Sequence, residues 1–188
     1  MKSGYVAVIG RPNVGKSTLI NALLGQKVAA VSPKPQTTRR QQLGILTRGE
    51  IQIAFVDTPG IHQPRHKLGE ILNQQAEAAL EHVNAILWMV SVADEPTEDD
   101  RRIAAYLAQL KRRAPLVVAA NKLDLVPPEA LSAKTAPYQE LVTNAPVIPV
   151  SAVQSMGLDA LLEALSAHLA ERDPDYDPEQ VTDYYERD

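Results

Sequence analysis

The chain has 188 residues, which is enough for one domain or for one domain with a tail. Its net charge of -4 gives no general attraction to nucleic acid or to anionic membranes. The absence of cysteine excludes disulfides and thiolate metal sites. No apolar run is long enough for a membrane span, and residues 1–4 lead directly into a predicted strand. We therefore expect no transmembrane segment, no signal peptide and a cytoplasmic location.

Short apolar segments alternate with segments of helical apolar spacing along most of the chain. The predicted strands are residues 5–9, 43–47, 51–56, 85–90, 116–120 and 147–150. The predicted helices are residues 18–24, 68–81, 98–113, 129–142 and 158–169. The short connection over residues 48–50 makes the second and third strands an antiparallel hairpin. This alternation predicts an α/β fold with a mostly parallel six-stranded sheet, helices on both faces and one antiparallel edge hairpin.

The stretch GRPNVGKS, from Gly10 to Ser17, fits the phosphate-binding pattern GxxxxGK[ST]. It follows a predicted strand and opens a predicted helix, as the pattern requires. The glycines let backbone N–H groups approach a polyphosphate, Lys16 places a positive charge between the β- and γ-phosphates, and Ser17 offers a hydroxyl to Mg²⁺. We assign the whole loop and the next residue to nucleotide binding: Gly10, Arg11, Pro12, Asn13, Val14, Gly15, Lys16, Ser17 and Thr18.

Two further segments are candidates for the γ-phosphate and Mg²⁺ side of this site. Asp57 directly follows a strand and begins the pattern D-x-x-G, which would place its carboxylate near Mg²⁺ and the Gly60 N–H near the γ-phosphate. Residues 27–40 are typical of a long functional loop, in which a threonine hydroxyl would complete the Mg²⁺ shell. Thr37 and Thr38 both qualify, and we favour Thr38.

The pattern Asn121-Lys122-x-Asp124 follows another strand and indicates selection of guanine. An ionised Asp124 accepts two hydrogen bonds, which suits the N1–H and 2-amino groups of guanine and leaves adenine without a match. The Lys122 stem would cover the base, and Asn121 would tie this loop to the phosphate loop. Ser151 and Ala152 follow the last strand and would present a backbone N–H to guanine O6.

These motifs, in this order and spacing, resemble the GTPase domain of the Era family, which is one of the translation-factor-related bacterial GTPases. The resemblance rests on GRPNVGKS, QTTR, DTPG, NKLD and SA, and it covers about residues 5 to 170. It implies the P-loop GTPase fold, binding of GTP, GDP and Mg²⁺, and hydrolysis of GTP by a cytoplasmic switch in small-subunit assembly.

The resemblance also implies partners and a domain organisation. Family members act on 16S ribosomal RNA and the 30S subunit, associate peripherally with membranes, and carry a C-terminal KH domain that binds RNA. Here residues 1–172 would be the GTP-binding domain, and the acidic residues 173–188 would be a linker or tail toward a KH domain that this chain lacks. We therefore do not expect strong RNA binding by this chain alone.

Hydrolysis poses a question, because Ile61 stands where Ras-like enzymes have a water-positioning glutamine. We assign catalytic roles to Lys16, Thr38, Gly60 and Asn13. In related GTPases with this loop, the asparagine is associated with a bound K⁺ that replaces an arginine finger, which makes Asn13 a candidate K⁺ ligand. The alternative general bases His62 and His66 lie in the same irregular segment as Ile61.

Two other classes of function compete with a GTP-hydrolysing switch. One is a non-enzymatic module that senses GTP against GDP with negligible turnover, a reading that Ile61 keeps open. The other is an ATPase with the same phosphate loop, which Asp124 disfavours because adenine offers neither of the donors that its carboxylate needs.

Overall fold

The computed structural model describes residues 1–25, 41–58 and 77–176, and the elements below belong to these ranges. The strands are β1 (Lys2–Gly10), β2 (Gln41–Arg48), β3 (Ile51–Asp57), β4 (Ala85–Ser91), β5 (Leu116–Asn121), β6 (Val147–Pro149) and β7 (Ala170–Glu171). The helices are α1 (Lys16–Leu24), α3 (Glu98–Gln109), α4 (Leu131–Leu141) and α5 (Leu158–Ser166), with single-turn helices η1 (Leu123–Leu125) and η2 (Pro128–Ala130). Residues 77–81 are also helical.

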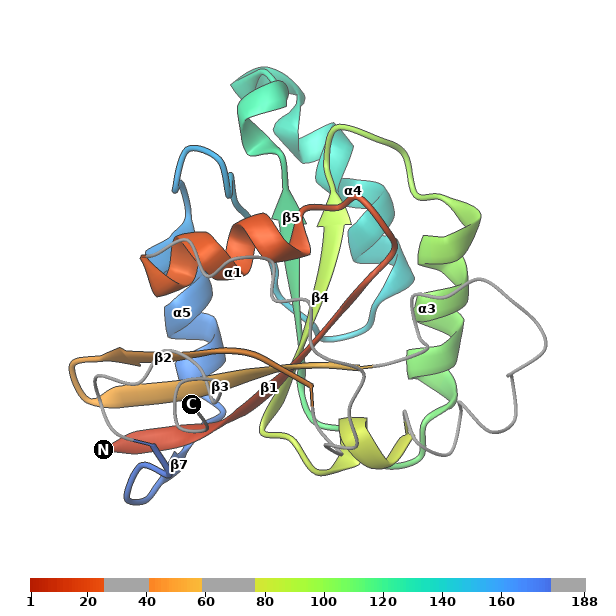
Figure 1. Cartoon of the computed structure of the whole chain (residues 1–188). Helices are drawn as coiled ribbons and strands as arrows, with labels where there is room; N and C mark the ends of the chain where they lie inside the picture. Colours follow the sequence, from red (N-terminus) through yellow and green to blue (C-terminus); the bar gives the residue numbers. More distant parts are fainter. Residues whose placement is uncertain (26–40, 59–76, 177–188) are drawn as a thin grey trace.

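The strands form one sheet in the order β2-β3-β1-β4-β5-β6 (Figure 1). The pairs β3–β1, β1–β4, β4–β5 and β5–β6 are parallel, whereas β2 and β3 form the predicted antiparallel edge hairpin. A seventh strand, which the sequence did not predict, is antiparallel to β1 through Lys2 and Ser3. It fits there because β4 joins β1 only from Val6 onward. Two residues carry no periodicity that would have identified β7.

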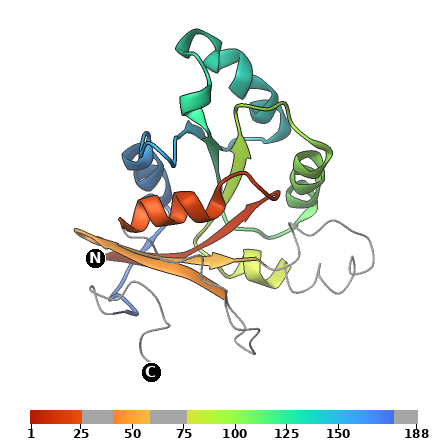
Figure 2. The ribbon, with the colours of Figure 1, turned by 45° about the horizontal axis from the view of Figure 1, so that its top comes forward.

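Both faces of the sheet are covered, as predicted (Figures 1 and 2). Alternate residues of β1 enter separate cores: Val6 and Val8 pack on the side of α1 and α5, whereas Ala7 and Ile9 pack on the side of α3 and α4. The same alternation runs along β4, whose seven residues are all buried. This double burial explains why residues 5–9 and 85–90 are apolar throughout and not only at every second residue.

Four helices differ from their predicted bounds, although α1 differs only by beginning at Lys16 and not at residue 18. α3 ends at Gln109 and not at residue 113, because Leu110 is extended and Arg113 folds back to donate from Nε to the Leu107 carbonyl at 3.3 Å. The predicted helix 129–142 is divided into η2 and α4, and α5 ends at Ser166. Among the described residues, no helix combines the length and the apolar character needed to cross a membrane.

After α5 the chain returns to the N-terminal end of the sheet. The Arg172 N–H donates to the Met1 carbonyl at 3.0 Å. Gln52 of β3, 2% exposed, accepts a hydrogen bond from the Tyr176 N–H at 3.2 Å and donates to the Tyr176 carbonyl at 2.9 Å. The first residues of the acidic segment therefore lie against the sheet, at the end of β3 opposite Asp57.

Candidate functional site

Four of the predicted motifs lie at one edge of the sheet, because each follows the carboxyl end of a parallel strand. The phosphate loop follows β1, Asp57 ends β3, Asn121 ends β5, and Ser151 comes two residues after β6. In the sheet, β3 lies on one side of β1 and β4 lies on the other side. The direction in which successive strands are added therefore reverses at β1. The carboxyl ends of strands beside such a reversal are where ligands of open α/β sheets bind.

The phosphate loop depends on its two glycines. Gly15 has a φ of 97°, and a β-carbon there would collide with the side-chain amide of Asn121. At Gly10 a β-carbon would lie 2.9 Å from the Met89 carbonyl oxygen and 3.1 Å from Val14 Cγ2. Asn13 also has a positive φ, 67°, which asparagine tolerates better than most residues. The loop therefore curls tightly between β1, β4 and the segment after β5.

The start of α1 differs from the start of α3 in a way that suits an anion. Within the described ranges, α1 has no side-chain cap and no acidic residue in its first turn. In α3, by contrast, Thr97 and Asp100 form a reciprocal capping box that satisfies the first N–H groups. The uncapped N–H groups of α1 are donors that a phosphate would accept from.

Lys16 and Asp57 set the charge at this point. Burial lowers the pKa of the Lys16 ammonium, and the nearby Asp57 carboxylate partly opposes this by raising it. A phosphate beside Lys16 would favour the charged form further. The Asp57 Oδ1 accepts a hydrogen bond from the Thr58 N–H at 2.9 Å, which orients the carboxylate.

The oxygen donors here fit Mg²⁺. Ser17 supplies a hydroxyl and Asp57 a carboxylate, the hard ligands that Mg²⁺ takes alongside substrate phosphates. In residues 1–25, 41–58 and 77–176, no three or more His, Cys, Asp or Glu side chains group closely enough to hold a metal ion by themselves. The chain therefore matches a cation that arrives with the nucleotide better than one held by a protein cage.

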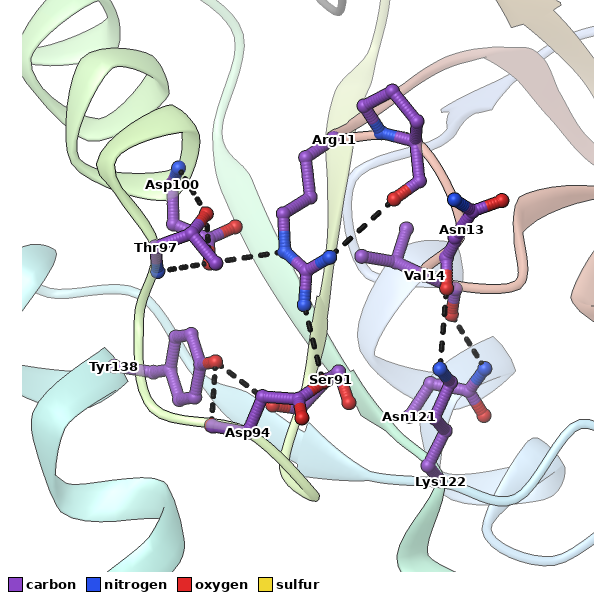
Figure 3. A network of polar contacts seen from close by, with 11 residues as sticks. Arg11, Asn13, Val14, Ser91, Asp94, Thr97, Asp100, Asn121, Lys122 and Tyr138 are labelled. Carbon is purple, nitrogen blue, oxygen red and sulfur yellow. Dashed lines mark hydrogen bonds and ion pairs between the residues drawn. The ribbon is translucent and has the colours of Figure 1, made fainter.

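Asn121 joins three segments of the site, and Figure 3 shows its contact with the phosphate loop. Its Nδ2 donates to the Val14 carbonyl of the phosphate loop at 2.8 Å, and its Oδ1 accepts from the Ala152 N–H at 3.0 Å. The side chain is 4% exposed. The expected tie between Asn121 and the phosphate loop is present, and Lys122 adds a second one by donating from Nζ to the Asn13 carbonyl at 3.2 Å.

Asp124 and Ser151 form a contact that sequence reasoning missed. The Ser151 Oγ donates to Asp124 Oδ1 at 2.8 Å. The Ser151 Oγ also accepts a hydrogen bond from the Gln154 N–H at 3.2 Å. Ser151 is fully buried, so its hydroxyl holds the carboxylate in a fixed orientation. The signal in the sequence is a serine after a strand, downstream of N-K-x-D, because a serine can donate from its hydroxyl as well as from its backbone N–H.

The Ser151 and Ala152 N–H groups, the expected donors to guanine O6, have partners within the protein in this structure. The Ser151 N–H donates to the Met156 carbonyl at 3.0 Å, and the Ala152 N–H donates to Asn121 Oδ1. Both donors are used within the protein in this structure. These two residues therefore support the base-selecting loop, and the contact of one of these N–H groups with guanine O6 stays a prediction.

Arg11 belongs to the phosphate loop, but its side chain contacts another segment of the chain. Its guanidinium, 14% exposed, turns toward the start of α3 and pairs with Asp94 at 3.2 Å and Asp100 at 3.3 Å (Figure 3). Its charge is thus matched by two carboxylates, and its contribution to a phosphate site is confined to the backbone. Asp100 lies 89 residues away from Arg11 in sequence, so no local sequence pattern could predict this ion pair.

Several predicted site residues lie outside the described ranges. These are Thr37, Thr38, Gly60, Ile61, His62 and His66. The residues brought to one edge of the sheet are therefore those of the phosphate loop, the end of β3, and the loops after β5 and β6.

Comparison with known proteins identifies the group to which this arrangement belongs. Residues 5–122 match the family described as 50S ribosome-binding GTPase. GTPase Era of Staphylococcus haemolyticus is 40% identical over 186 residues, which is 99% of this chain and 62% of that protein. The chain thus spans less than two thirds of the length of this relative.

Two solved structures are similar over nearly the whole chain. An Aquifex aeolicus Era variant bound to GDP·AlF4⁻ has a TM-score of 0.78 at 35% identity, over 97% of this chain and 62% of that one. Era in complex with MgGDPNP and nucleotides 1506–1542 of 16S ribosomal RNA has a TM-score of 0.73, again at 35% identity, with coverage of 97% and 62%. The family match covers more than half of the chain and agrees with the fold and the strand-end motifs: the chain belongs to the 50S ribosome-binding GTPase family.

Proposed function

We propose that this chain binds GTP and GDP with Mg²⁺ and hydrolyses GTP as a molecular switch. The observation that carries the proposal is the Asn121 side chain, which joins the phosphate loop to the base-selecting loops at one edge of the sheet. A phosphate cradle and a two-acceptor carboxylate held in one rigid unit match the two ends of a guanine nucleotide. The similarity to Era bound to GDP·AlF4⁻ and to MgGDPNP supports the same reading.

Each residue of the site has a role in this proposal. The phosphate-loop N–H groups and Lys16 bind the β- and γ-phosphates and stabilise the charge that develops as the γ-phosphoryl group is transferred. Asp124, oriented by Ser151, accepts the two guanine donors. Ser17, Asp57 and Thr38 would hold Mg²⁺, which supplies positive charge to the phosphates. Thr38 and Gly60 respond to the γ-phosphate.

Asn13 is proposed as a ligand of K⁺. Its side chain is exposed, and its side-chain oxygen has no hydrogen bond to the residues that the structure describes. Its backbone carbonyl is held by Lys122. A side-chain oxygen on a fixed backbone in the phosphate loop fits a monovalent cation, which would add to the positive charge of Lys16 between the β- and γ-phosphates.

Single-turnover hydrolysis tests both the activity and the role of Asn13. In saturating Mg²⁺ we expect conversion of GTP but not of ATP, and faster hydrolysis in K⁺ than in Na⁺ at matched ionic strength. The gain should reach about tenfold, because preorganised charge at a transferring phosphoryl group is worth about 10²–10³ in rate when fully engaged. Asn13→Ala should lose this gain.

The control for that experiment is Asn84→Ala, which changes an asparagine beside Tyr5 at the other end of β1. It should keep the K⁺ gain. Equal parent rates in K⁺ and Na⁺ would exclude the cation and return attention to His62, His66 or an external activator. Tight GTP binding without turnover in either salt would favour the non-enzymatic sensing module.

The ribosomal role is a broader proposal. Era has been solved with a 16S ribosomal RNA fragment, and the present chain spans 62% of that protein's length. We propose that residues 1–172 are the GTP-binding domain of a protein acting in assembly of the 30S subunit, and that residues 173–188 connect it to a KH domain. The contacts of Tyr176 with Gln52 would set the direction in which that connection leaves the sheet.

RNA binding by this chain alone is expected to be weak. The net charge of -4 and the acidic last residues give little counterion release, so we expect a Kd of about micromolar or weaker for a 16S ribosomal RNA 3′ fragment at physiological salt. Fluorescence anisotropy would measure it, with a version extended through a KH domain as the comparison. A specific nanomolar complex of residues 1–188 would contradict this.

Cytoplasmic location and peripheral membrane association stay predictions, which cell fractionation and vesicle sedimentation would test.

A further inference from the structure

Arg11 connects the phosphate loop to α3 through a nearly buried ion pair. Its Nε donates to Asp100 Oδ2 at 3.3 Å, and its Nη2 donates to Asp94 Oδ2 at 3.2 Å (Figure 3). Its Nη1 also donates to the Pro12 carbonyl at 3.4 Å, so the guanidinium binds the loop that it comes from. One planar group thus joins the loop, the segment before α3 and the first turn of α3.

Asp100 makes this connection hard to dispense with. Its side chain is fully buried, and its Oδ2 also accepts from the Thr97 N–H at 2.9 Å and from the Thr97 hydroxyl at 3.1 Å. Its Oδ1 has no partner among the described residues. A buried carboxylate needs an opposite charge, and Arg11 is the cation that touches it. The pairing therefore holds Arg11 toward α3 in a single arrangement.

The other side of the connection is held from α4. The Tyr138 hydroxyl lies 2.8 Å from the Ser91 carbonyl and 2.9 Å from the Asp94 carbonyl, both of which accept from it. Burial, followed by the charge of Asp100, raises the pKa of Tyr138, so the phenol remains a neutral donor. Residues 91–97, which carry Asp94, are thereby fixed to the body of the domain. Arg11 is bound to a rigid support.

We infer that the Arg11–Asp100 ion pair is a positioning device for the phosphate loop: it holds the first half of the loop in place, while Asn121 holds the second half through Val14. Arg11 is a positioning residue here, since its guanidinium faces α3. The inference rests on the proposed function. It adds a physical reason for an arginine at the second position of this loop, where the phosphate pattern itself accepts any residue.

The inference makes a prediction that separates phosphate binding from base binding. A loop held at both ends presents its N–H groups in the geometry that a β-phosphate needs, so its preorganisation raises the affinity for GDP. GMP lacks the β-phosphate but keeps the base. Loosening the first half of the loop should therefore lower the affinity for GDP and leave that for GMP nearly unchanged. A purely structural role would change the fraction of folded protein and not this ratio.

The test uses Arg11→Met and the double variant Arg11→Met/Asp100→Asn. The single variant leaves a buried carboxylate unpaired, so we expect a clearly lower midpoint of urea unfolding. The double variant removes both charges and keeps an amide oxygen to cap α3, so the midpoint should recover most of the loss. In both variants the ratio of GDP to GMP affinity, measured by titration with Mg²⁺, should fall about tenfold, as expected from misplacing one charge-assisted hydrogen bond.

Arg102→Met is the matched control. Arg102 lies on α3, the helix that carries Asp100, and its side chain pairs with Glu98 at 3.3 Å. Unlike Arg11, the Arg102 side chain is 60% exposed. Neither the unfolding midpoint nor the affinity ratio should change in this variant. Amide exchange of residue 11 and residues 13–15 in the protein without nucleotide gives a second measurement, and it should speed up in the double variant and not in the control.

The outcomes are distinct. A parent protein that does not bind GDP would overturn the proposed function, and this inference with it. A parent that prefers GDP strongly over GMP, together with a double variant of unchanged ratio and unchanged loop exchange, would overturn the inference and leave the proposed function standing. A double variant that is as stable as expected but has a lower ratio of GDP to GMP affinity would establish the positioning role.

Discussion

Asp124→Asn is expected to reverse the base preference of this chain, from guanosine to xanthosine triphosphate. The carboxylate offers two acceptors to the N1–H and 2-amino groups of guanine, whereas an amide offers one acceptor and one donor and so matches xanthine. Sites built on such hydrogen bonds discriminate by about 10⁴–10⁵, so we expect a change of several orders of magnitude in the ratio of the two affinities. Titration of parent and variant with both nucleotides measures it.

The surroundings of Asp124 make this substitution interpretable. Its Oδ1 is held by the Ser151 hydroxyl at 2.8 Å, and a hydroxyl can donate to an amide oxygen as it does to a carboxylate. The fold should therefore tolerate the change. Asp159→Asn on α5, where the side chain is 99% exposed, is the control for loss of one negative charge and should leave both affinities unchanged. A variant that binds the two nucleotides as the parent does would show that Asp124 does not select the base.

Asn121→Ala should have the second-largest effect, because it disconnects the phosphate loop from the base-selecting loops. It removes the donor to the Val14 carbonyl and the acceptor for the Ala152 N–H, both in buried surroundings. Each unpaired buried group costs about 1–3 kcal/mol, so we expect the free energy of unfolding to fall by about 2–4 kcal/mol. The affinities for GTP and GDP should fall together, by about 100-fold or more, since both ends of the nucleotide lose their common support.

Asn84→Ala separates the loss of stability from the loss of binding. Asn84 Oδ1 accepts from the Tyr5 N–H at 2.9 Å, far along β1 from the phosphate loop. Its removal should also lower the free energy of unfolding, as measured by urea titration, but it should not change nucleotide affinity in the folded protein. If Asn121→Ala lowered affinity no more than Asn84→Ala does, the bridging role of Asn121 would be excluded.

The amino-acid sequence by itself determined the α/β class, the hairpin and the place of each motif. Residues 5–9, 85–90 and 116–120 were predictable as strands because they are apolar without interruption, which reflects burial on both faces of the sheet. The hairpin was predictable from the short connection between its two strands. The phosphate loop, Asp57 and Asn121 were predictable because each stands directly after such a strand, and parallel strands bring their carboxyl ends to one edge. All of this information is local: a few consecutive residues and their spacing carry it.

The tertiary structure alone decided which side chains meet. Arg11 reaches Asp100 across 89 residues, and the Ser151 hydroxyl reaches Asp124 across 27. Neither partner was predictable, because the loops after β1, β4, β5 and β6 converge through the folding of the whole sheet. The same reason explains β7, whose two residues pair with β1 because α5 returns the chain to its start. Periodicity and motif spacing report which residues are buried or lie at a strand end, whereas hydrogen-bond partners depend on where distant loops come to rest.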